Sequence, residues 1–532
     1  MKLFLYFLFL TNLLTFQNFI SAQNTTNNRS IDVQHYQFEI TVNDSTNIIE
    51  GIATITLKIN NAIKEFNLDL ISLDENEKGM SVSQVLNNNR KVPFQHNKNK
   101  LNIQIPSNIN DSIKVFTIKY HGIPKDGLII SKNKFGDRTF FGDNWPTRAK
   151  NWLPCVDELS DKATVDFIVK APSYYQVIAN GTLIEEVNLN DQIKLYHYSS
   201  KNLLPTYLMV IGVARFAVQY LGEFNQTPLS TWVYPQNKKE GFYDYAQAIP
   251  IIEYYVNHIA PFPFSKLANV QSKTRFGGME NASAIFYSEK SVTGKRNQEA
   301  LLAHEIAHQW FGDSATEREW PHLWLSEGFA TYFTSLYFEN KYGKEKLNER
   351  LINERNKIIR FSEKQQTPVI DTKTKNYMKL LNANSYEKGA WFLHMLRTKI
   401  GDELFWKSIK EYYKKYQFDN AVTEDFRSIV ESFYNKDLSV FFDQWLYGIG
   451  QPELDLQWKN KSNEIDITIN QTQKTKTIFD FPLELLFKFD DGSTKIKTLS
   501  IDQKKQTFTF PIHTQIIEIV IDPNVSLLYK SK

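Results

Sequence analysis

The sequence predicts a multidomain α+β protein with an antiparallel β domain, a mostly helical domain and a small C-terminal β-sandwich. Its 532 residues are too many for one hydrophobic core, so several domains are expected. Apolar residues make up 42% of the chain and aromatic residues 14%, which is typical of a globular protein. The period of the apolar residues changes twice along the chain. These changes predict domains at 23–217, 218–450 and 451–532.

Residues 23–217 have the pattern of antiparallel strands. Apolar and polar residues alternate from Phe38 to Val42 and again from Ala53 to Ile59, with a turn at Asn43–Ser45 between the two runs. The same alternation recurs at Val115–Tyr120 and Thr164–Val169. Alternation with a period of two is that of a strand with one buried face.

Helical periods dominate residues 218–450. They are clear in Ile251–Ile259, Glu299–Phe311, Lys388–Lys399 and Thr423–Tyr434.

The last eighty or so residues return to alternation. Ile465, Ile467 and Ile469 alternate with polar residues. The turn residues Asp490–Gly492 join two further alternating runs, which predicts a hairpin. We therefore expect a small β-sandwich here.

The first residues, Met1–Ala22, are typical of a secretory signal peptide. Lys2 precedes an apolar run, and Ile20–Ala22 offers a small residue at the cleavage site. An uncleaved membrane anchor is the alternative, but polar residues interrupt the apolar run and leave it short for a span. We expect an exported protein, periplasmic or secreted, with no stable membrane insertion after cleavage. The single Cys155 forbids an intrachain disulfide, so stability must come from core burial.

The charge balance argues against a nucleic-acid partner. The 62 basic and 59 acidic residues leave a net charge of +3, and no basic stripe stands out in the sequence.

The most informative pattern is H-E-x-x-H at His304–His308, followed by Glu327. On a helix, His304 and His308 share one face and can bind the same ion. Two histidines and a glutamate are the ligands of a catalytic zinc, with a fourth position left for water. Glu305 lies beside them and can act as general base on that water. The sequence therefore predicts one Zn²⁺ per chain.

A solvated surface helix is the plainer interpretation of this motif. Its flanks are apolar at helical spacing, however, from Leu301 to Phe311. They indicate a buried helix, in which His and Glu side chains are costly unless they bind something.

Four motifs resemble those of zinc aminopeptidases similar to aminopeptidase N, a gluzincin family that also includes leukotriene hydrolase. They are GGMEN at Gly277–Asn281, HEIAHQWFGD at His304–Asp313, WLSEGFA at Trp324–Ala330 and YEKGA at Tyr386–Ala390. The resemblance covers nearly the whole chain after the leader. It implies a thermolysin-like catalytic domain that removes N-terminal residues from peptides with a free N-terminus.

The resemblance also implies roles for residues outside the ligand set. Tyr386 would stabilise the oxyanion, and Glu280 would pair with the substrate ammonium. Gly277 and Gly278 would let a peptide backbone pair with the strand edge, and Met279 would support the first substrate side chain.

The sequence departs from the family pattern at two positions. Counting back from Arg148, Asp143 stands where the family usually has a glutamine that contacts the substrate amine. Whether Asp143, Asn144 or neither makes that contact stays open. Ser326 stands where many relatives have asparagine before the third zinc ligand.

Three alternative functions remain. An endopeptidase would need a cleft open on both sides, and Glu280 argues against it. A bifunctional aminopeptidase and epoxide hydrolase shares the motifs, which do not discriminate. A catalytically silent peptide-binding protein should have lost metal ligands or Glu305, and all are present.

Many relatives also carry a large helical domain that roofs the active site. The sequence ends at Lys532 without one. We expect the roof to be absent or supplied by another chain, and the cleft to be more open.

Overall fold

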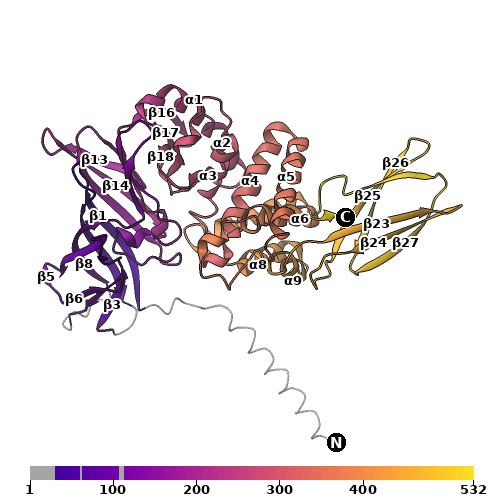
Figure 1. Ribbon diagram of the computed structural model, residues 1–532, viewed down its shortest axis with the longest axis horizontal. Helices are drawn as coiled ribbons and strands as arrows, with labels where there is room; N and C mark the ends of the chain where they lie inside the picture. Colours follow the sequence, from indigo (N-terminus) through magenta and orange to yellow (C-terminus); the bar gives the residue numbers. More distant parts are fainter. Residues whose placement is uncertain (1–29, 60–62, 107–112) are drawn as a thin grey trace, which may run out of the picture.

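The computed structural model describes residues 30–59, 63–106 and 113–532. A β-rich N-terminal part, a helical middle part and a C-terminal β part follow one another along the long axis (Figure 1). The predicted fold class is confirmed. The expected signal peptide, Met1–Ala22, lies outside the described residues. No helix in the described ranges combines the length and the apolar character needed to cross a membrane.

The N-terminal part is built on an eight-stranded sheet. In spatial order its strands are β13 (Thr182–Asn188), β14 (Ile193–Leu204), β11 (Ala163–Pro172), β1 (Ile31–Thr41), β2 (Ile49–Ile59), β8 (Ile113–Ile123), β4 (Gly79–Asn87) and β5 (Arg90–Lys91). The expected antiparallel pairing holds except between β1 and β11, which run parallel. Alternate residues of β1 and β2 are buried, as the sequence pattern predicts.

Two smaller sheets complete this part. One contains β12 (Gln176–Ala179), β15 (Ile211–Ala214), β10 (Arg138–Gly142) and β9 (Leu128–Lys132), and the other β3 (Glu65–Asp69), β7 (Lys100–Gln104) and β6 (Phe94–Asn97).

The middle part begins with a five-stranded sheet. Its order is β16 (Ala217–Phe224), β17 (Thr227–Val233), β18 (Leu267–Ser272), β20 (Ala284–Ser288) and β19 (Gly278–Met279). The three inner strands are parallel, and both edge strands are antiparallel to their neighbours. The edge strand β19 carries part of the GGMEN motif.

Helices form the rest of the middle part. They are α1 (Lys238–Tyr245), α2 (Ala248–His258), α3 (Glu299–His308), α4 (Trp324–Tyr342), α5 (Lys344–Ser362), α6 (Gly389–Ile400), α7 (Asp402–Tyr416), α8 (Thr423–Tyr434) and α9 (Ser439–Phe442). The four expected helices correspond to α2, α3, α6 and α8 within a few residues at their ends. Two short strands, β21 (Thr316–Glu317) and β22 (Asn420–Ala421), pair in parallel.

The C-terminal part consists of two sheets. One contains β27 (Lys505–Pro511), β24 (Glu464–Gln471), β23 (Glu453–Asn460) and β29 (Lys530–Ser531), and the other β26 (Thr494–Ile501), β25 (Phe481–Phe489) and β28 (Ile516–Ile521). The predicted hairpin is the antiparallel pair β25 and β26. The buried faces of both sheets join one hydrophobic cluster with the helices of the middle part.

Two hydrophobic clusters account for the cores, and the motifs lie where they meet. The helices α3 and α4 contribute to the cluster shared with the C-terminal part. Met279 and Ala282, from the GGMEN segment and the residue after it, pack instead with the N-terminal cluster. A site between them is therefore built from two separately packed cores.

Candidate metal centre and active site

Two neighbouring helices, α3 and α4, bring the three expected ligands together. His304 and His308 lie one turn apart on α3, and Glu327 lies in the first turn of α4. The two Nε2 atoms are 3.0 Å apart, and Oε2 of Glu327 lies 3.1 Å from one and 3.2 Å from the other. Four ligands in tetrahedral geometry at about 2.0–2.1 Å from a zinc ion would be roughly 3.3 Å apart. The three side chains therefore fit one such ion.

Neighbouring groups orient His308. Its Nδ1 lies 3.1 Å from the backbone oxygen of Phe311, so the ring can donate there and turn an unprotonated Nε2 towards the ion. The hydroxyl of Ser326 lies 3.1 Å from the same nitrogen. Ser326, where relatives often have asparagine, thus supports a ligand.

Two of the three side chains, Glu327 and His304, have the charges that suit a metal centre. Burial acts to raise the pKa of Glu327, but His308 and His304 lower it well below its usual range. Burial is the main cause that lowers the pKa of His304. An ionised carboxylate and a neutral imidazole are the forms that bind metal. Burial acts to lower the pKa of His308, but the neighbouring carboxylate of Glu327 raises it well above its usual range.

Glu305 lies on the same helix and faces the GGMEN strand. Its side chain is buried, and burial raises its pKa well above the usual range. A Cβ added to Gly278 would lie 2.3 Å from Oε1 of Glu305. The glycine therefore leaves the space that this carboxylate occupies. A carboxylate with a raised pKa is suited to accept a proton during a reaction.

The strand β19 exposes one backbone edge to the cavity, because β20 covers only the other. Glu280 follows this strand and is buried, and burial raises its pKa to about 7. Gln309, the residue after α3, donates to the backbone oxygen of Glu280 at 2.6 Å. The side-chain oxygen of Gln309 also accepts from the Ser283 amide at 2.8 Å. Gln309 thus fixes the backbone of Glu280 relative to His304 and His308.

Tyr386 reaches the centre from a short π-helical segment, Asn384–Lys388. Such segments are rare and are often found at functional sites. The Tyr386 hydroxyl donates to Oε1 of Glu327 at 2.7 Å, and its ring stacks on His304 with centroids 5.9 Å apart. A Cβ added to Gly328 would lie 2.9 Å from the Cα of Gly389. These glycines let α4 and α6 approach, which brings Tyr386 close to Glu327.

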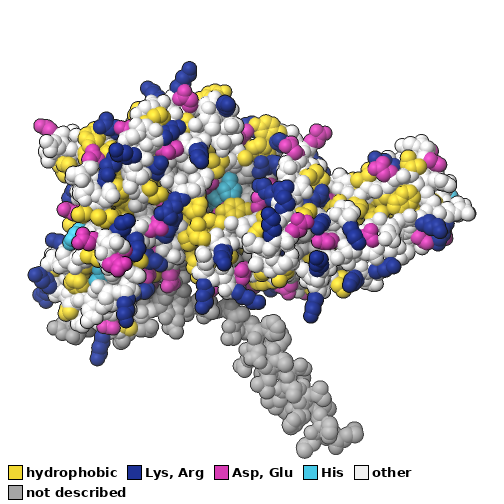
Figure 2. Space-filling view, in the orientation of Figure 1, with side chains coloured by type: hydrophobic (Ala, Val, Ile, Leu, Met, Phe, Trp, Pro, Cys, Tyr) yellow, Lys and Arg dark blue, Asp and Glu magenta, His cyan; other side chains and the backbone are white. Residues whose placement is uncertain are grey.

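These residues line a cavity of about 580 Å³. In the space-filling view a hollow with histidine at its floor is flanked by hydrophobic side chains and by a group of Lys and Arg side chains (Figure 2). The sequence prediction found the following lining residues: Gly277, Gly278, Met279, Glu280, His304, Glu305, His308, Glu327 and Tyr386.

Other lining residues were missed by the sequence prediction. They are Trp145, Phe276, Leu301, Lys357, Leu381, Asn382, Ala383 and Glu387. Phe276 directly precedes the GGMEN motif and Glu387 lies within YEKGA, and those positions are the signal that could have found them. Lys357 lies on α5 and pairs with Glu387 at 2.8 Å. In the sequence it cannot be told from the other charged residues of that helix.

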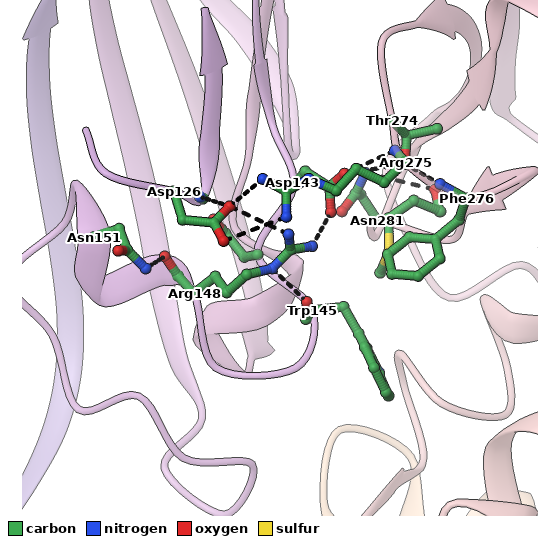
Figure 3. Close-up of polar contacts among 12 residues, drawn as sticks. Asp126, Asp143, Trp145, Arg148, Asn151, Thr274, Arg275, Phe276 and Asn281 are labelled. Atoms are coloured by element: carbon green, nitrogen blue, oxygen red, sulfur yellow. Dashed lines mark hydrogen bonds and ion pairs between the residues drawn. The ribbon is translucent and has the colours of Figure 1, made fainter. Parts of the chain in front are cut away.

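Asp143 and Asn144 do not reach the cavity. Asp143 is fully buried and pairs with Arg148 (Figure 3). Asn144 donates to the backbone oxygen of Met209 at 2.8 Å and accepts from the indole of Trp152 at 2.9 Å. Both side chains are thus hydrogen-bonded inside the protein and do not line the cavity, and the amine contact considered for them stays a prediction. Trp145, the next residue, does line the cavity.

Two family models match the chain. The peptidase M1 N-terminal domain matches residues 32–208, and the peptidase family M1 domain matches residues 243–445. Together they match most of the chain, and the second contains all three ligand positions.

Similar proteins are aminopeptidases from several kingdoms. Aminopeptidase M1 of Arabidopsis thaliana is 27% identical over 60% of this chain and 38% of its own length. Probable aminopeptidase 1 of Sulfurisphaera tokodaii is 24% identical over 90% of this chain and 61% of its own length. The match thus spans less than two thirds of either relative.

A solved structure has the same fold. The structure of Legionella pneumophila aminopeptidase A in complex with aspartic acid aligns with a TM-score of 0.82 at 18% identity. The alignment covers 96% of this chain and 60% of the other.

Proposed function

The chain belongs to peptidase family M1, and we propose that it is a zinc-dependent aminopeptidase that removes N-terminal residues from peptides. The observation that carries this proposal is the position of Glu280. A buried carboxylate lies at the end of an exposed strand edge, in the same cavity as Glu305 and the three possible metal ligands. Such a carboxylate can bind the substrate ammonium and so fix the scissile bond one residue from the N-terminus.

The strand β19 would orient the substrate. Its free edge can pair with the backbone of an extended peptide, as in other modes of strand addition. With the ammonium at Glu280, the first peptide carbonyl would lie over the metal ligands. A peptide with a blocked N-terminus would leave Glu280 buried without its partner, which is costly.

A zinc ion held by His304, His308 and Glu327 would lower the pKa of water and polarise the scissile carbonyl. Glu305 would take the proton from the attacking water and pass it to the leaving amine. The hydroxyl of Tyr386 would donate a hydrogen bond to the developing oxyanion.

Hydrolysis of aminoacyl anilides tests the proposal. We expect turnover with free-amine substrates, loss of turnover with a zinc chelator and recovery on adding Zn²⁺. N-acetylated substrates should not be cut. Cleavage of acetylated peptides would instead favour an endopeptidase. Absence of any chelator-sensitive turnover, with peptide binding retained, would favour a silent binding protein.

We also propose that the protein is exported. The composition of Met1–Ala22 supports this. Cleavage of a tagged chain near Ala22 on secretion would test it, and an uncleaved, membrane-bound product would contradict it.

A further inference from the structure

A buried ion pair in the N-terminal part also accepts hydrogen bonds from the catalytic part (Figure 3). Asp143 and Arg148 lie on the segment after β10, and their side chains are 0% and 13% exposed. The Arg148 guanidinium contacts Oδ1 of Asp143 and donates to Asp126 at 3.2 Å. Burying a carboxylate is costly unless it is paired and hydrogen-bonded, so this arrangement must satisfy both of its oxygens.

The second oxygen of Asp143 reaches across to the catalytic part. Oδ2 accepts from the backbone amide of Arg275 at 3.0 Å and from the hydroxyl of Thr274 at 3.3 Å. The Arg275 side chain forms an ion pair with Asp126 of the N-terminal part, with Nη2 2.5 Å from Oδ1. This turn directly precedes Phe276 and the two glycines of the GGMEN motif. Asp143 therefore holds the upstream end of the segment that pairs with substrate.

Arg148 positions Trp145, which with Phe276 forms one wall of the cavity, called here the Trp145–Phe276 wall. Its Nε donates to the backbone oxygen of Trp145 at 2.6 Å. The rings of Trp145 and Phe276 meet edge to face with centroids 6.0 Å apart, and both line the cavity. One ring comes from the N-terminal part and the other from the catalytic part. The Asp143–Arg148 pair binds the backbone beside each ring.

The downstream end of the segment is held separately. Asn180 donates to the backbone oxygen of Ala282 at 2.8 Å. Gln309 fixes the backbone of Glu280, as described above. Neither contact involves Asp143, so loss of the ion pair should loosen the Trp145–Phe276 wall while Glu280 stays in place.

We propose that Asp143 is a positioning residue that sets the Trp145–Phe276 wall of the substrate cavity through Arg148 and the Thr274–Phe276 turn. This role rests on the proposed aminopeptidase function. It also gives a reason for the departure from the expected glutamine. A carboxylate offers two acceptors, one for the guanidinium and one for the turn, whereas a glutamine amide offers one acceptor and one donor.

The test compares Asp143→Asn with the wild type on free-amine anilides. The hydrogen bonds of Asp143 go to Arg148, Thr274 and Arg275, not to the side chains expected to carry out the chemistry. We therefore expect KM to rise roughly tenfold and kcat to change by less than about twofold. The rise should be larger for phenylalanine and leucine anilides than for alanine anilide. Rejection of acetylated substrates should persist, because Glu280 is held by other contacts.

Asp522→Asn is the matched control. Asp522 is also buried, pairs with Arg355 at 3.2 Å and accepts from the Ser526 amide at 2.7 Å, but it joins the catalytic part to the C-terminal sheets. It should show a comparable fall in unfolding midpoint with an unchanged KM. An equal rise of KM in both variants, or an unchanged KM in Asp143→Asn, would overturn the positioning role.

Thr274→Val provides a test if Asp143→Asn does not fold. It removes one donor to Asp143 and conserves volume, and we expect KM to rise by roughly two- to fivefold. An unchanged KM would again contradict the proposal. Failure of the aminopeptidase proposal is distinguishable, because then the wild type itself would not cleave these substrates.

Discussion

Glu305 on α3 occupies the space that a side chain at Gly278 on β19 would need. A Cβ on Gly278 would lie 2.3 Å from Oε1 and 2.4 Å from Cδ of Glu305. Gly278→Ala should therefore displace the carboxylate and lower kcat by roughly 100-fold, which is the scale for a misplacement of about 1 Å. Steady-state kinetics on an aminoacyl anilide would measure this.

Gly277→Ala is the control for this prediction. A Cβ there meets only the Cδ1 atom of Leu301, at 3.6 Å, which is ordinary contact. It adds the same methyl group to the residue just before β19 without touching Glu305, so its loss of kcat should be much smaller. Equal losses in the two variants would show that strand stiffness, and not the carboxylate, is the cause.

Glu305→Gln should separate metal binding from proton transfer. The ligand atoms of His304, His308 and Glu327 do not include Glu305, so bound zinc should stay near one per chain. Loss of a general base should lower kcat by roughly 100- to 10,000-fold. Metal analysis of the purified variant and its kinetics together test this. Undiminished turnover would remove Glu305 as the base.

Tyr386→Phe tests a residue with two contacts. The hydroxyl donates to Glu327, and the ring, which the variant keeps, stacks on His304. Loss of an oxyanion donor should lower kcat by roughly 100- to 1,000-fold with a smaller change in KM. A changed metal affinity with unchanged kcat would instead mean that the hydroxyl serves only to orient Glu327.

Glu280→Ala should weaken recognition of the substrate ammonium. A hydrogen bond to a charged group contributes about 1.5–3 kcal/mol, so KM for free-amine substrates should rise roughly 10- to 100-fold. The preference over acetylated substrates should shrink by a similar factor. A preserved preference would place amine recognition elsewhere in the cavity.

The motifs predicted that the side chains of His304, His308 and Glu327 converge, and short-range geometry is the reason. The spacing of His304 and His308 needs only a helix, and Glu327 needs only the adjacent helix. The Trp145–Phe276 wall could not be predicted in this way. Trp145 and Phe276 are 131 residues apart and meet only because two domains pack together.

Asp143 shows the same limit more sharply. Its position in the sequence suggested a contact with the substrate amine. The direction of its side chain, however, depends on Arg148 and on a turn from the other domain. The position of Lys357 at the cavity likewise depends on how α5 packs. Only the three-dimensional contacts show that Asp143 is a buried, paired carboxylate and that Lys357 lines the cavity instead of facing the solvent.

His394 makes the junction with the C-terminal sheets sensitive to acid. Its Nε2 lies 2.9 Å from the backbone oxygen of Val525, and its Nδ1 lies 3.0 Å from the hydroxyl of Tyr332. A neutral ring satisfies both contacts, since it can donate to the carbonyl and accept from the hydroxyl. Burial lowers the pKa of His394 from 6.5 to about 4. Between these values the unfolded chain binds the proton and the folded protein does not, so stability rises with pH across this window and is lost as pH falls.

The integrated effect is about 3 kcal/mol between pH 7 and pH 4. His394→Gln keeps a donor and an acceptor but does not titrate. Urea unfolding at pH 7, 5.5 and 4 should therefore show the wild type losing more stability than the variant as pH falls. Other groups titrate in both proteins, so the difference between the two curves isolates His394. Parallel curves would mean that His394 keeps its ordinary pKa in the folded protein, and that its burial between α6 and the C-terminal sheets has no influence on acid stability.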